Sequence, residues 1–316
     1  MSGFGWASTT DEVLAGKDLS GRTVFITGAN SGLGQETARA MASKGAHVVM
    51  AGRDQHKLDA AVAAIRETLP KAQLDTLTVD LGSLESIRAA TSRARQAFPR
   101  IDLLINNAGV MATPFEHTAD GFERQFGTNH LGHFALTAEL MPAIERGHLK
   151  RIVNLSSRGH FMGQVDFDDP NFTRRPYDPW ASYGQSKTAN VLFTVGLEQR
   201  FAVLGIHAYA VHPGGIETNL GRYMTPEMRE GLMKRVSSSD TGFAWKTIPQ
   251  GAATSCWAAT ADELEGCGGV YCEDCHVAEV DDENPKEGVR SYAVNRSYAD
   301  RLWKLSEELT GAQFPS

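Results

Sequence analysis

Cysteine is scarce in this sequence of 316 residues, which contains four, and long apolar runs are missing. A membrane-spanning helix needs about 20 consecutive apolar residues, and no such stretch occurs. The N-terminal segment also lacks the basic region and the apolar core of a secretory signal. Because there is no export signal, the few cysteines are expected to be reduced thiols. These absences predict a cytoplasmic protein with no membrane span.

An excess of positive charge is missing as well. The 31 lysines and arginines are outnumbered by 38 aspartates and glutamates, which gives a net charge of −7. Such a chain has no overall basic field to attract nucleic acid or anionic lipid. A chain of this length buries roughly 75% of its unfolded surface, so its stability requires no disulfide or structural metal. Nucleic acid is therefore not an expected partner.

Short β-rich segments alternate with longer helical patterns along the chain. The expected strands are almost entirely apolar, which is typical of strands covered on both faces. They are residues 23–27, 47–51, 74–79, 103–106, 151–155, 207–211 and 269–271. The expected helices are near residues 33–44, 55–68, 84–97, 119–145, 182–203, 250–260 and 298–310. This alternation predicts an α/β fold with a doubly wound, Rossmann-type, mainly parallel seven-stranded sheet and helices on both faces.

No linker rich in proline, glycine or serine divides the chain, so a single domain is expected. Residues 1–18 are interpreted as an N-terminal arm, and residues 19–316 as a dinucleotide-binding catalytic domain. The segment 219–248 follows the sixth expected strand and is rich in methionine, serine and glycine. Long irregular segments in compact domains are usually functional, so this one is the predicted substrate loop.

A glycine-rich turn joins the first expected strand to the helix that follows it. Glycine permits a sharp reversal of the chain and lets backbone amides approach a pyrophosphate at the N-terminus of the helix. The strand–turn–helix context makes this signal stronger than the glycines alone. The candidate cofactor-binding residues of the turn are Gly28, Asn30, Ser31, Gly32, Leu33 and Gly34.

The end of the second expected strand bears on the choice between NAD and NADP. An NAD site usually places a carboxylate there, against the ribose 2′-hydroxyl. Here Gly52 takes that position and Arg53 follows it. A guanidinium can hold a 2′-phosphate through paired, charge-assisted hydrogen bonds. Arg53 therefore favours NADP, while Asp54 keeps NAD open because a shift of one residue restores a carboxylate.

Two later strand ends add candidate cofactor contacts. Asp80 and Leu81 follow the third expected strand, and Asp80 is suited to accept from the adenine amino group. Small residues after the fourth expected strand would let the backbone pass close to the ribose. These residues are Asn107, Ala108 and Gly109. Both sites lie at the carboxyl ends of strands, where open α/β sheets bind ligands.

Tyr183 and Lys187 are four residues apart at the start of an expected helix, so their side chains share one face. A phenol with a pKa near 10 is a poor acid or base at neutral pH. A neighbouring ammonium, and the positive charge of an oxidised nicotinamide, would lower that pKa. The pair is therefore predicted to exchange a proton with an alcohol or carbonyl while the cofactor transfers hydride.

Two polar residues complete the predicted catalytic group. Ser157 follows the fifth expected strand and is preferred over Ser156, because it lies nearer the site and strand alternation points the two to different sides. Its hydroxyl would stabilise developing negative charge on the substrate oxygen. Asn129 lies inside the long expected helix, where asparagine is a poor helix former. We expect it to hold a water that links Lys187 to solvent.

These motifs appear in the order found in short-chain dehydrogenases/reductases, and the resemblance covers residues 19–310. Within that family, the sequence is most similar to the branch of retinol dehydrogenases and WW-domain oxidoreductases, although no WW module and no membrane anchor precede the domain. The resemblance implies a catalytic tetrad of Asn129, Ser157, Tyr183 and Lys187, with the last two also contacting cofactor. It further implies nicotinamide contacts from Pro213, Gly214 and Thr218. It also implies a homo-oligomer, a dimer or tetramer, formed through the helices carrying Asn129 and Tyr183. The strings that carry the branch assignment are TGANSGLG, AGRD, TNHLGHFALT, YGQSKTANVLF and VHPGGIETNL.

The expected substrate is a bulky hydrophobic secondary alcohol or its ketone, similar to a steroid, a retinoid or an aryl ketone. Met224, Met228 and Leu232 suit a lid over such a ligand, but their i,i+4 spacing is also that of the packing face of a short helix, which is slightly favoured. Two alternatives stay open. One is reduction of a conjugated carbon–carbon double bond, as in protochlorophyllide reductases, and the other is a non-catalytic dinucleotide-binding regulator.

Three cysteines and a histidine near the C-terminus resemble a metal or haem motif. They are Cys267, Cys272, Cys275 and His276. A C-x-x-C-H string attaches haem in exported proteins, and zinc would need four well-placed ligands. Packing and loop thiols are the preferred interpretation, so we expect no metal.

Overall fold

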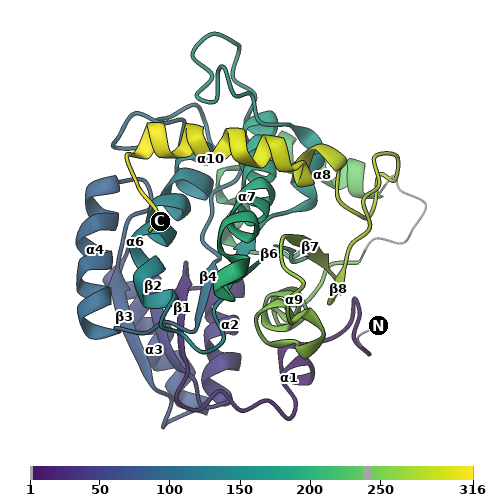
Figure 1. Cartoon of the computed structure of the whole chain (residues 1–316). Coiled ribbons are helices and arrows are strands. Elements are labelled where there is room, and N and C mark those ends of the chain that lie inside the picture. Colours follow the sequence, from purple (N-terminus) through teal and green to yellow (C-terminus); the bar gives the residue numbers. More distant parts are fainter. Residues whose placement is uncertain (1–2, 238–243, 316) are drawn as a thin grey trace.

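A computed structural model describes residues 3–237 and 244–315 of the chain (Figure 1). Its centre is one sheet of eight strands in the order β3-β2-β1-β4-β5-β6-β7-β8. The first seven strands pair in parallel, and β8 is antiparallel to β7. The chain leaves β1 toward β2 on one side and returns to β4 on the other. That reversal of strand order is where open α/β sheets bind their ligands.

The predicted elements are found close to their expected bounds. The strands are β1 (Thr23–Thr27), β2 (His47–Gly52), β3 (Leu74–Thr78), β4 (Leu103–Asn106), β5 (Arg151–Leu155), β6 (His207–His212), β7 (Val270–Glu273) and β8 (His276–Val277). The helices are α1 (Thr10–Val13), α2 (Gly32–Ser43), α3 (Gln55–Thr68), α4 (Leu84–Ala97), α5 (Arg124–Phe126), α6 (Gly132–Ile144), α7 (Pro179–Phe201), α8 (Pro226–Ser237), α9 (Ile248–Thr260) and α10 (Arg296–Thr310).

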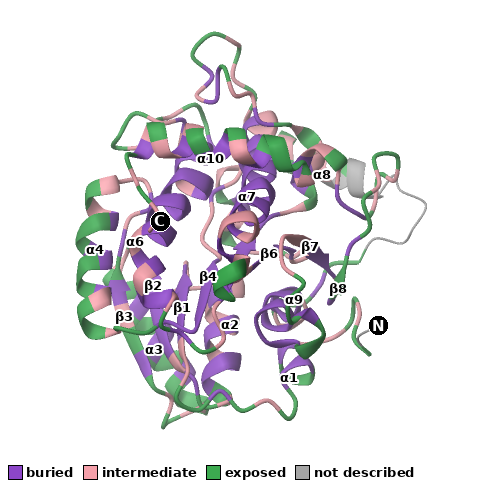
Figure 2. Ribbon diagram, in the orientation of Figure 1, coloured by how far each residue is buried: buried purple, intermediate pink, exposed green. Residues whose placement is uncertain are grey.

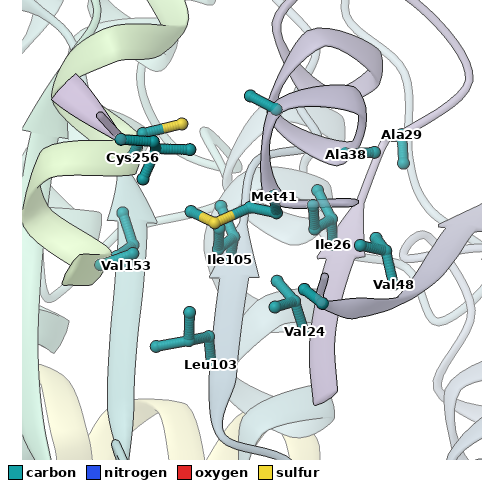
Figure 3. Close-up of a cluster of buried hydrophobic side chains, with 14 of the residues drawn as sticks. Val24, Ile26, Ala29, Ala38, Met41, Val48, Leu103, Ile105, Val153 and Cys256 are labelled. Atoms are coloured by element: carbon teal, nitrogen blue, oxygen red, sulfur yellow. The ribbon is translucent and has the colours of Figure 1, made fainter. Parts of the chain in front are cut away.

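Alternate residues of each central strand enter the cores on the two faces of the sheet. On one face, Val24 and Ile26 of β1 pack with Met41 of α2 and Cys256 of α9 (Figure 3). On the other face, Phe25 joins the core formed with α4, α6 and α7. Strands covered on both sides need apolar residues at every position, which is why their sequences are continuous apolar runs.

Three features differ from the expectation. The sheet has eight strands rather than seven, because the two-residue strand β8 is too short to leave a pattern in the sequence. The expected helix 119–145 is broken into α5, a π-helical segment (Gly127–Leu131) and α6. The expected arm contains the short helix α1, whose Thr10 and Val13 are buried. Of the expected substrate loop, residues 238–243 lie outside the described residues.

The C-terminal helix α10 covers α7 (Figures 1 and 2). Its Trp303 is buried in an aromatic cluster, with ring centroids 5.1 Å from Phe134, 5.9 Å from Phe193 and 4.4 Å from Phe314. The residues of α7 from Ser182 to Leu197 are all buried within the chain itself. A dimer formed through this part of α7, as the family resemblance implies, would therefore have to displace α10.

We predict that Trp303→Ala lowers the free energy of unfolding by about 3–5 kcal/mol, because it leaves a large cavity between α10, α6 and α7. Urea denaturation followed by circular dichroism measures this. The exposed Lys304 on the same helix supplies the control. Lys304→Ala should change stability by no more than about 0.5 kcal/mol. Equal effects of the two substitutions would show that α10 is not a structural part of the core.

Candidate active site

The turn between β1 and α2 depends on glycine at two positions. Gly28 has a φ of +65°, a left-handed conformation that side chains other than glycine rarely adopt. A Cβ added to Gly34 would lie 2.4 Å from the carbonyl oxygen of Gly28 and 2.5 Å from the side chain of Asn107. The two residues therefore let the first turn of α2 pack directly on the end of the strand. This packing brings the N-terminus of α2 to the edge of the sheet.

The N-terminus of α2 fits the pyrophosphate of a dinucleotide. Ser31 is the N-cap residue, and its side chain accepts no hydrogen bond from the first-turn amides. Such amides carry partial positive charge and need acceptors. Ser31 and Gly32 both line the main cavity, so a phosphate there could accept these hydrogen bonds.

Asn107 and Ala108 join the ends of β1 and β4. The Asn107 amide donates to the carbonyl oxygen of Thr27 at 2.8 Å, and the Ala108 N–H donates to the Thr27 hydroxyl at 3.0 Å. With Gly109 they line the cavity beside the glycine turn. The contact of this segment with the ribose of a cofactor stays a prediction.

The end of β2 presents Arg53 to the cavity. Its side chain is exposed and forms no ion pair with another described residue. Asp54 has a different task, because its carboxylate accepts from the Lys57 N–H at 3.2 Å and caps α3. A Cβ at Gly52 would lie 3.4 Å from the side-chain oxygen of Asn30. Gly52, Arg53 and Asp54 all line the cavity, so both the guanidinium and the carboxylate are present at this strand end.

Asp80 and Leu81 also line the cavity, beyond β3. One carboxylate oxygen of Asp80 accepts from the Gly82 N–H at 2.9 Å. This hydrogen bond fixes the carboxylate at the adenine side of the predicted site. Its contact with adenine stays a prediction.

Tyr183 and Lys187 lie on the first turns of α7, which begins where the Asp178 carboxylate accepts from the N–H groups of Trp180 and Ala181. Each of the two is only 4% exposed, and both line the cavity. The Lys187 ammonium lies 5.7 Å from the centre of the Tyr183 ring. It donates a hydrogen bond to the main-chain oxygen of Leu155 at 3.0 Å. The helix thus brings the phenol and the ammonium to one place, as their spacing predicts.

The pKa of Tyr183 in the chain alone differs from the expectation. Burial raises it to about 12, against a smaller lowering by a hydrogen bond with Ser157. Burial lowers the pKa of Lys187 to about 8. The pKa of Tyr183 in the protein without cofactor is therefore raised rather than lowered, because burial outweighs the groups beside it. A further positive charge in the cleft is needed to favour the phenolate.

The two adjacent serines have separate tasks. Ser156 is buried, and its hydroxyl donates its hydrogen to the main-chain oxygen of Lys187 at 2.9 Å. The Ser157 hydroxyl accepts from the Gly159 N–H at 3.0 Å and is the residue that lowers the pKa of Tyr183. This geometry favours Ser157 as the substrate-oxygen donor, which agrees with the choice made from strand alternation.

Asn129 lies in the π-helical segment and is fully buried. Its side-chain oxygen accepts from the Val110 N–H at 2.8 Å, and its amide donates to the Val110 carbonyl and to the Ser186 hydroxyl, both at 2.9 Å. All the hydrogens of its amide are therefore used by protein partners. This geometry does not favour a role of the side chain in holding water. It favours a role in fixing the segment beside Lys187.

These residues surround a cavity of about 1690 Å³. A single ligand usually occupies roughly 300–1,000 Å³, so the cavity has room for a dinucleotide and a second molecule. Pro213, Gly214 and Thr218 lie on its wall, and Gly214 has a φ of +92°. Several other side chains line the cavity without any signal in the sequence, because only the fold brings them together. They are Trp6, Arg158, Phe161, Met162, Trp180, His212, Trp245 and Glu273.

The side chains of the cysteine motif near the C-terminus do not form one group of ligands. Cys272 and Cys275 are buried, whereas Cys267 and His276 are exposed. Burial raises the pKa of the Cys275 thiol to about 11, which disfavours the thiolate that a metal requires. Within residues 3–237 and 244–315, no three His, Cys, Asp or Glu side chains are grouped as metal ligands.

Comparison with known proteins shows the class. The sequence model of the family described as short chain dehydrogenase matches residues 22–229. A chloroplastic short-chain dehydrogenase, TIC 32 B of Brassica napus, is 39% identical, and the match covers 98% of this chain and 94% of the relative. Retinol dehydrogenase 12 of Mus musculus is 40% identical over 94% of this chain and 88% of its own length. The crystal structure of an uncharacterised protein from Mycobacterium paratuberculosis covers both chains fully, with a TM-score of 0.74 and 36% identity.

The chain therefore belongs to the short-chain dehydrogenase/reductase family, in a branch similar to the retinol dehydrogenases. It is accordingly an NAD(P)-dependent oxidoreductase with a Rossmann-type fold. None of the helices in the described residues is both long and apolar enough to cross a membrane.

We predict that Lys187 titrates near pH 8 in the protein without cofactor, because its ammonium is buried. The folded pKa lies below the unfolded value of about 10.4, so the native state loses its proton first and stability rises with pH between these values. Lysine-selective ¹⁵N NMR should show a resonance that titrates near pH 8 in the wild type and is missing in Lys187→Met. A Lys187 resonance that titrates near pH 10 would contradict the buried position.

Proposed function

We propose that this protein interconverts a bulky hydrophobic secondary alcohol and its ketone, of steroid, retinoid or aryl-ketone type, with NADP as the preferred cofactor. The observation that carries the proposal is the convergence of Tyr183, Lys187 and Ser157 at the point where the cavity passes from the glycine turn to an apolar wall. The relatives named as retinol dehydrogenases support an apolar substrate.

Each catalytic residue has a task that follows from its surroundings. When bound, the nicotinamide supplies or accepts hydride at the substrate carbon. Tyr183 holds the proton that the substrate oxygen gains or loses. Ser157 lies beside that phenol and would donate to the same oxygen. Lys187, held by Leu155, lies 5.7 Å from the centre of the phenol ring and would contact the ribose of a bound cofactor.

The wall of the cavity beyond Ser157 supports an apolar ligand. Its side chains come from the turn after β5, from the start of α7 and from the segment after β6. They are Phe161, Met162, Trp180, Leu220, Met224 and Leu232. Charged residues also line the cavity, among them Arg158, Glu273 and Lys286. A substrate with an apolar body and a polar end fits this distribution.

Replacement of the phenol tests the reaction. Tyr183→Phe should lower kcat by at least about 100-fold, because general acid–base catalysis contributes roughly 10²–10⁴-fold. Binding of NADPH, measured by nucleotide fluorescence, should stay close to that of the wild type. The control is Tyr298→Phe, since this exposed tyrosine lies on α10 away from the cavity. Wild-type turnover in Tyr183→Phe would refute the proposed mechanism.

The preference for NADP rests on Arg53. Arg53→Gln should weaken NADPH binding by about 10- to 100-fold, since hydrogen bonds to charged groups contribute about 1.5–3 kcal/mol. NADH lacks the 2′-phosphate and should bind the variant as it binds the wild type. Titration calorimetry with both dinucleotides measures the difference. An equal loss for NADPH and NADH would mean that Arg53 does not contact a 2′-phosphate.

Product analysis separates ketone reduction from reduction of a conjugated double bond, because the proton donor and the cofactor are shared. A cytoplasmic location also stays a prediction, and the chloroplastic name of one relative indicates that compartments vary among these proteins. If the protein forms a homo-oligomer, we propose that its interface lies outside the part of α7 that α10 covers.

A further inference from the structure

His133 lies one helical turn after Asn129 and is 1% exposed. Its Nδ1 is 2.8 Å from the main-chain oxygen of Asn129, and its Nε2 is 2.9 Å from the hydroxyl of Thr27. The imidazole thus bridges the start of α6 and the end of β1. Neither the family motifs nor the proposed reaction assigns it a task.

The partners determine how the protons are arranged. A carbonyl oxygen only accepts, so Nδ1 of His133 carries the hydrogen and donates to Asn129. Nε2 then accepts from the Thr27 hydroxyl, which itself accepts from the Ala108 N–H at 3.0 Å. Each donor in this chain of hydrogen bonds therefore faces an acceptor. The chain runs from the segment after β4, through the end of β1, to the main chain of Asn129.

The imidazole is neutral at physiological pH. Burial lowers the pKa of His133 to about 4, although the hydrogen bond with Asn129 raises it, and the charge of Lys187 lowers it further. A neutral ring keeps one donor and one acceptor, which is what this chain of hydrogen bonds requires. A protonated ring would present two donors and could not accept from Thr27.

The π-helical segment explains why such a bridge is useful. Around Asn129 the backbone bonding is of the i→i+5 type, since the Gly132 N–H donates to the Gly127 carbonyl. Single π-helical turns are uncommon and cluster at functional sites. A side-chain donor on the Asn129 carbonyl stabilises this turn and ties it to the end of the strand that precedes the glycine turn.

We propose that His133 is a positioning residue that fixes Asn129 relative to the cofactor cleft. Asn129 in turn holds the backbone of Val110 and the hydroxyl of Ser186, the residue next to Lys187. Loss of the imidazole bridge would let this assembly shift against β1. The kinetic test of this inference rests on the proposed function, whereas a second test, by hydrogen exchange, does not depend on turnover.

The adjoining π-helical segment contains a matched control. His130 is also fully buried and neutral, with a pKa lowered to about 3 by burial. Its Nε2 lies 2.8 Å from the hydroxyl of Ser306 on α10, away from the cleft. His130→Phe and His133→Phe therefore each remove one buried imidazole from neighbouring turns. Only the second variant breaks the link to Asn129.

His133→Phe should lower kcat by about 10- to 100-fold, because small displacements of catalytic groups have effects of this size. KM for the cofactor should stay near the wild-type value, since the glycine turn and Arg53 are untouched. His130→Phe should keep kcat near the wild-type value even where urea denaturation shows a comparable loss of stability. Equal kcat losses in the two variants would reduce His133 to a structural residue and overturn the proposal.

A second substitution tests the bridge from its other end. Thr27→Val removes the hydroxyl with little change of shape. If the two residues act through one chain, Thr27→Val combined with His133→Phe should lower kcat by less than the product of the two single effects. Fully additive effects on kcat would overturn the proposal.

Hydrogen exchange at the Val110 amide provides the test that does not depend on turnover. This N–H donates to Asn129, so its exchange should become faster in His133→Phe and stay unchanged in His130→Phe. If the wild type shows no turnover that depends on Tyr183, the proposed function fails while the exchange result still decides the role of His133. Unchanged exchange at Val110 in His133→Phe would overturn that role.

Discussion

The burial of a phenol and an ammonium in one water-poor cleft is the constraint on which this protein depends. Tyr183 and Lys187 lose most of their contact with solvent, and no carboxylate among the described residues pairs with Lys187. Burial alone favours the neutral form of both side chains, as their pKa directions show. A positive charge added next to them, such as an oxidised nicotinamide, favours the phenolate and the neutral amine. The cleft thus links the charge state of a cofactor to the position of a proton.

The fold supports this arrangement through close backbone contacts rather than through flexible side chains. Gly28 and Gly34 let α2 approach the end of β1, and Asn107 fastens that turn to the strand on the other side of the topological reversal. At the same edge of the sheet, Asn129 of the π-helical segment accepts a hydrogen bond from the Val110 N–H. Groups held by several hydrogen bonds and by packing from both sides are preorganised, which lowers the cost of orienting a substrate.

Most of the fold and the positions of the glycine turn, Tyr183 and Lys187 could be predicted from the sequence, because the patterns that indicate them are local. Continuous apolar strands, glycines at a strand–helix turn and the spacing of Tyr183 and Lys187 each depend on a few neighbouring residues. The raised pKa of Tyr183 could not be predicted, because the burial that causes it depends on segments distant in the sequence. The break in the helix around Asn129 and the bridge from His133 to Thr27 also depend on contacts between distant segments. The capping of α3 by Asp54 was likewise not predicted, while the choice between NADP and NAD at this strand end stays open.

The cofactor preference and the substrate depend on side chains that only the fold brings together. Arg53 was recognisable because it follows a strand directly, whereas Phe161, Trp180 and Trp6 reach the cavity from three separate segments. The C-terminal helix is a similar case. Its amphipathic pattern predicts a helix, and only the structure shows that it covers the part of α7 that the family resemblance assigns to a partner subunit.

The number of protons released when NADP⁺ binds tests the central claim most directly. Titration calorimetry near pH 8, in buffers that differ in ionisation enthalpy, measures it. If the nicotinamide charge acts on the buried pair, NADP⁺ releases protons in the wild type and releases fewer in Lys187→Met, while NADPH releases few in either. Equal proton release for NADP⁺ and NADPH in the wild type would contradict a coupling between cofactor charge and the Tyr183–Lys187 pair.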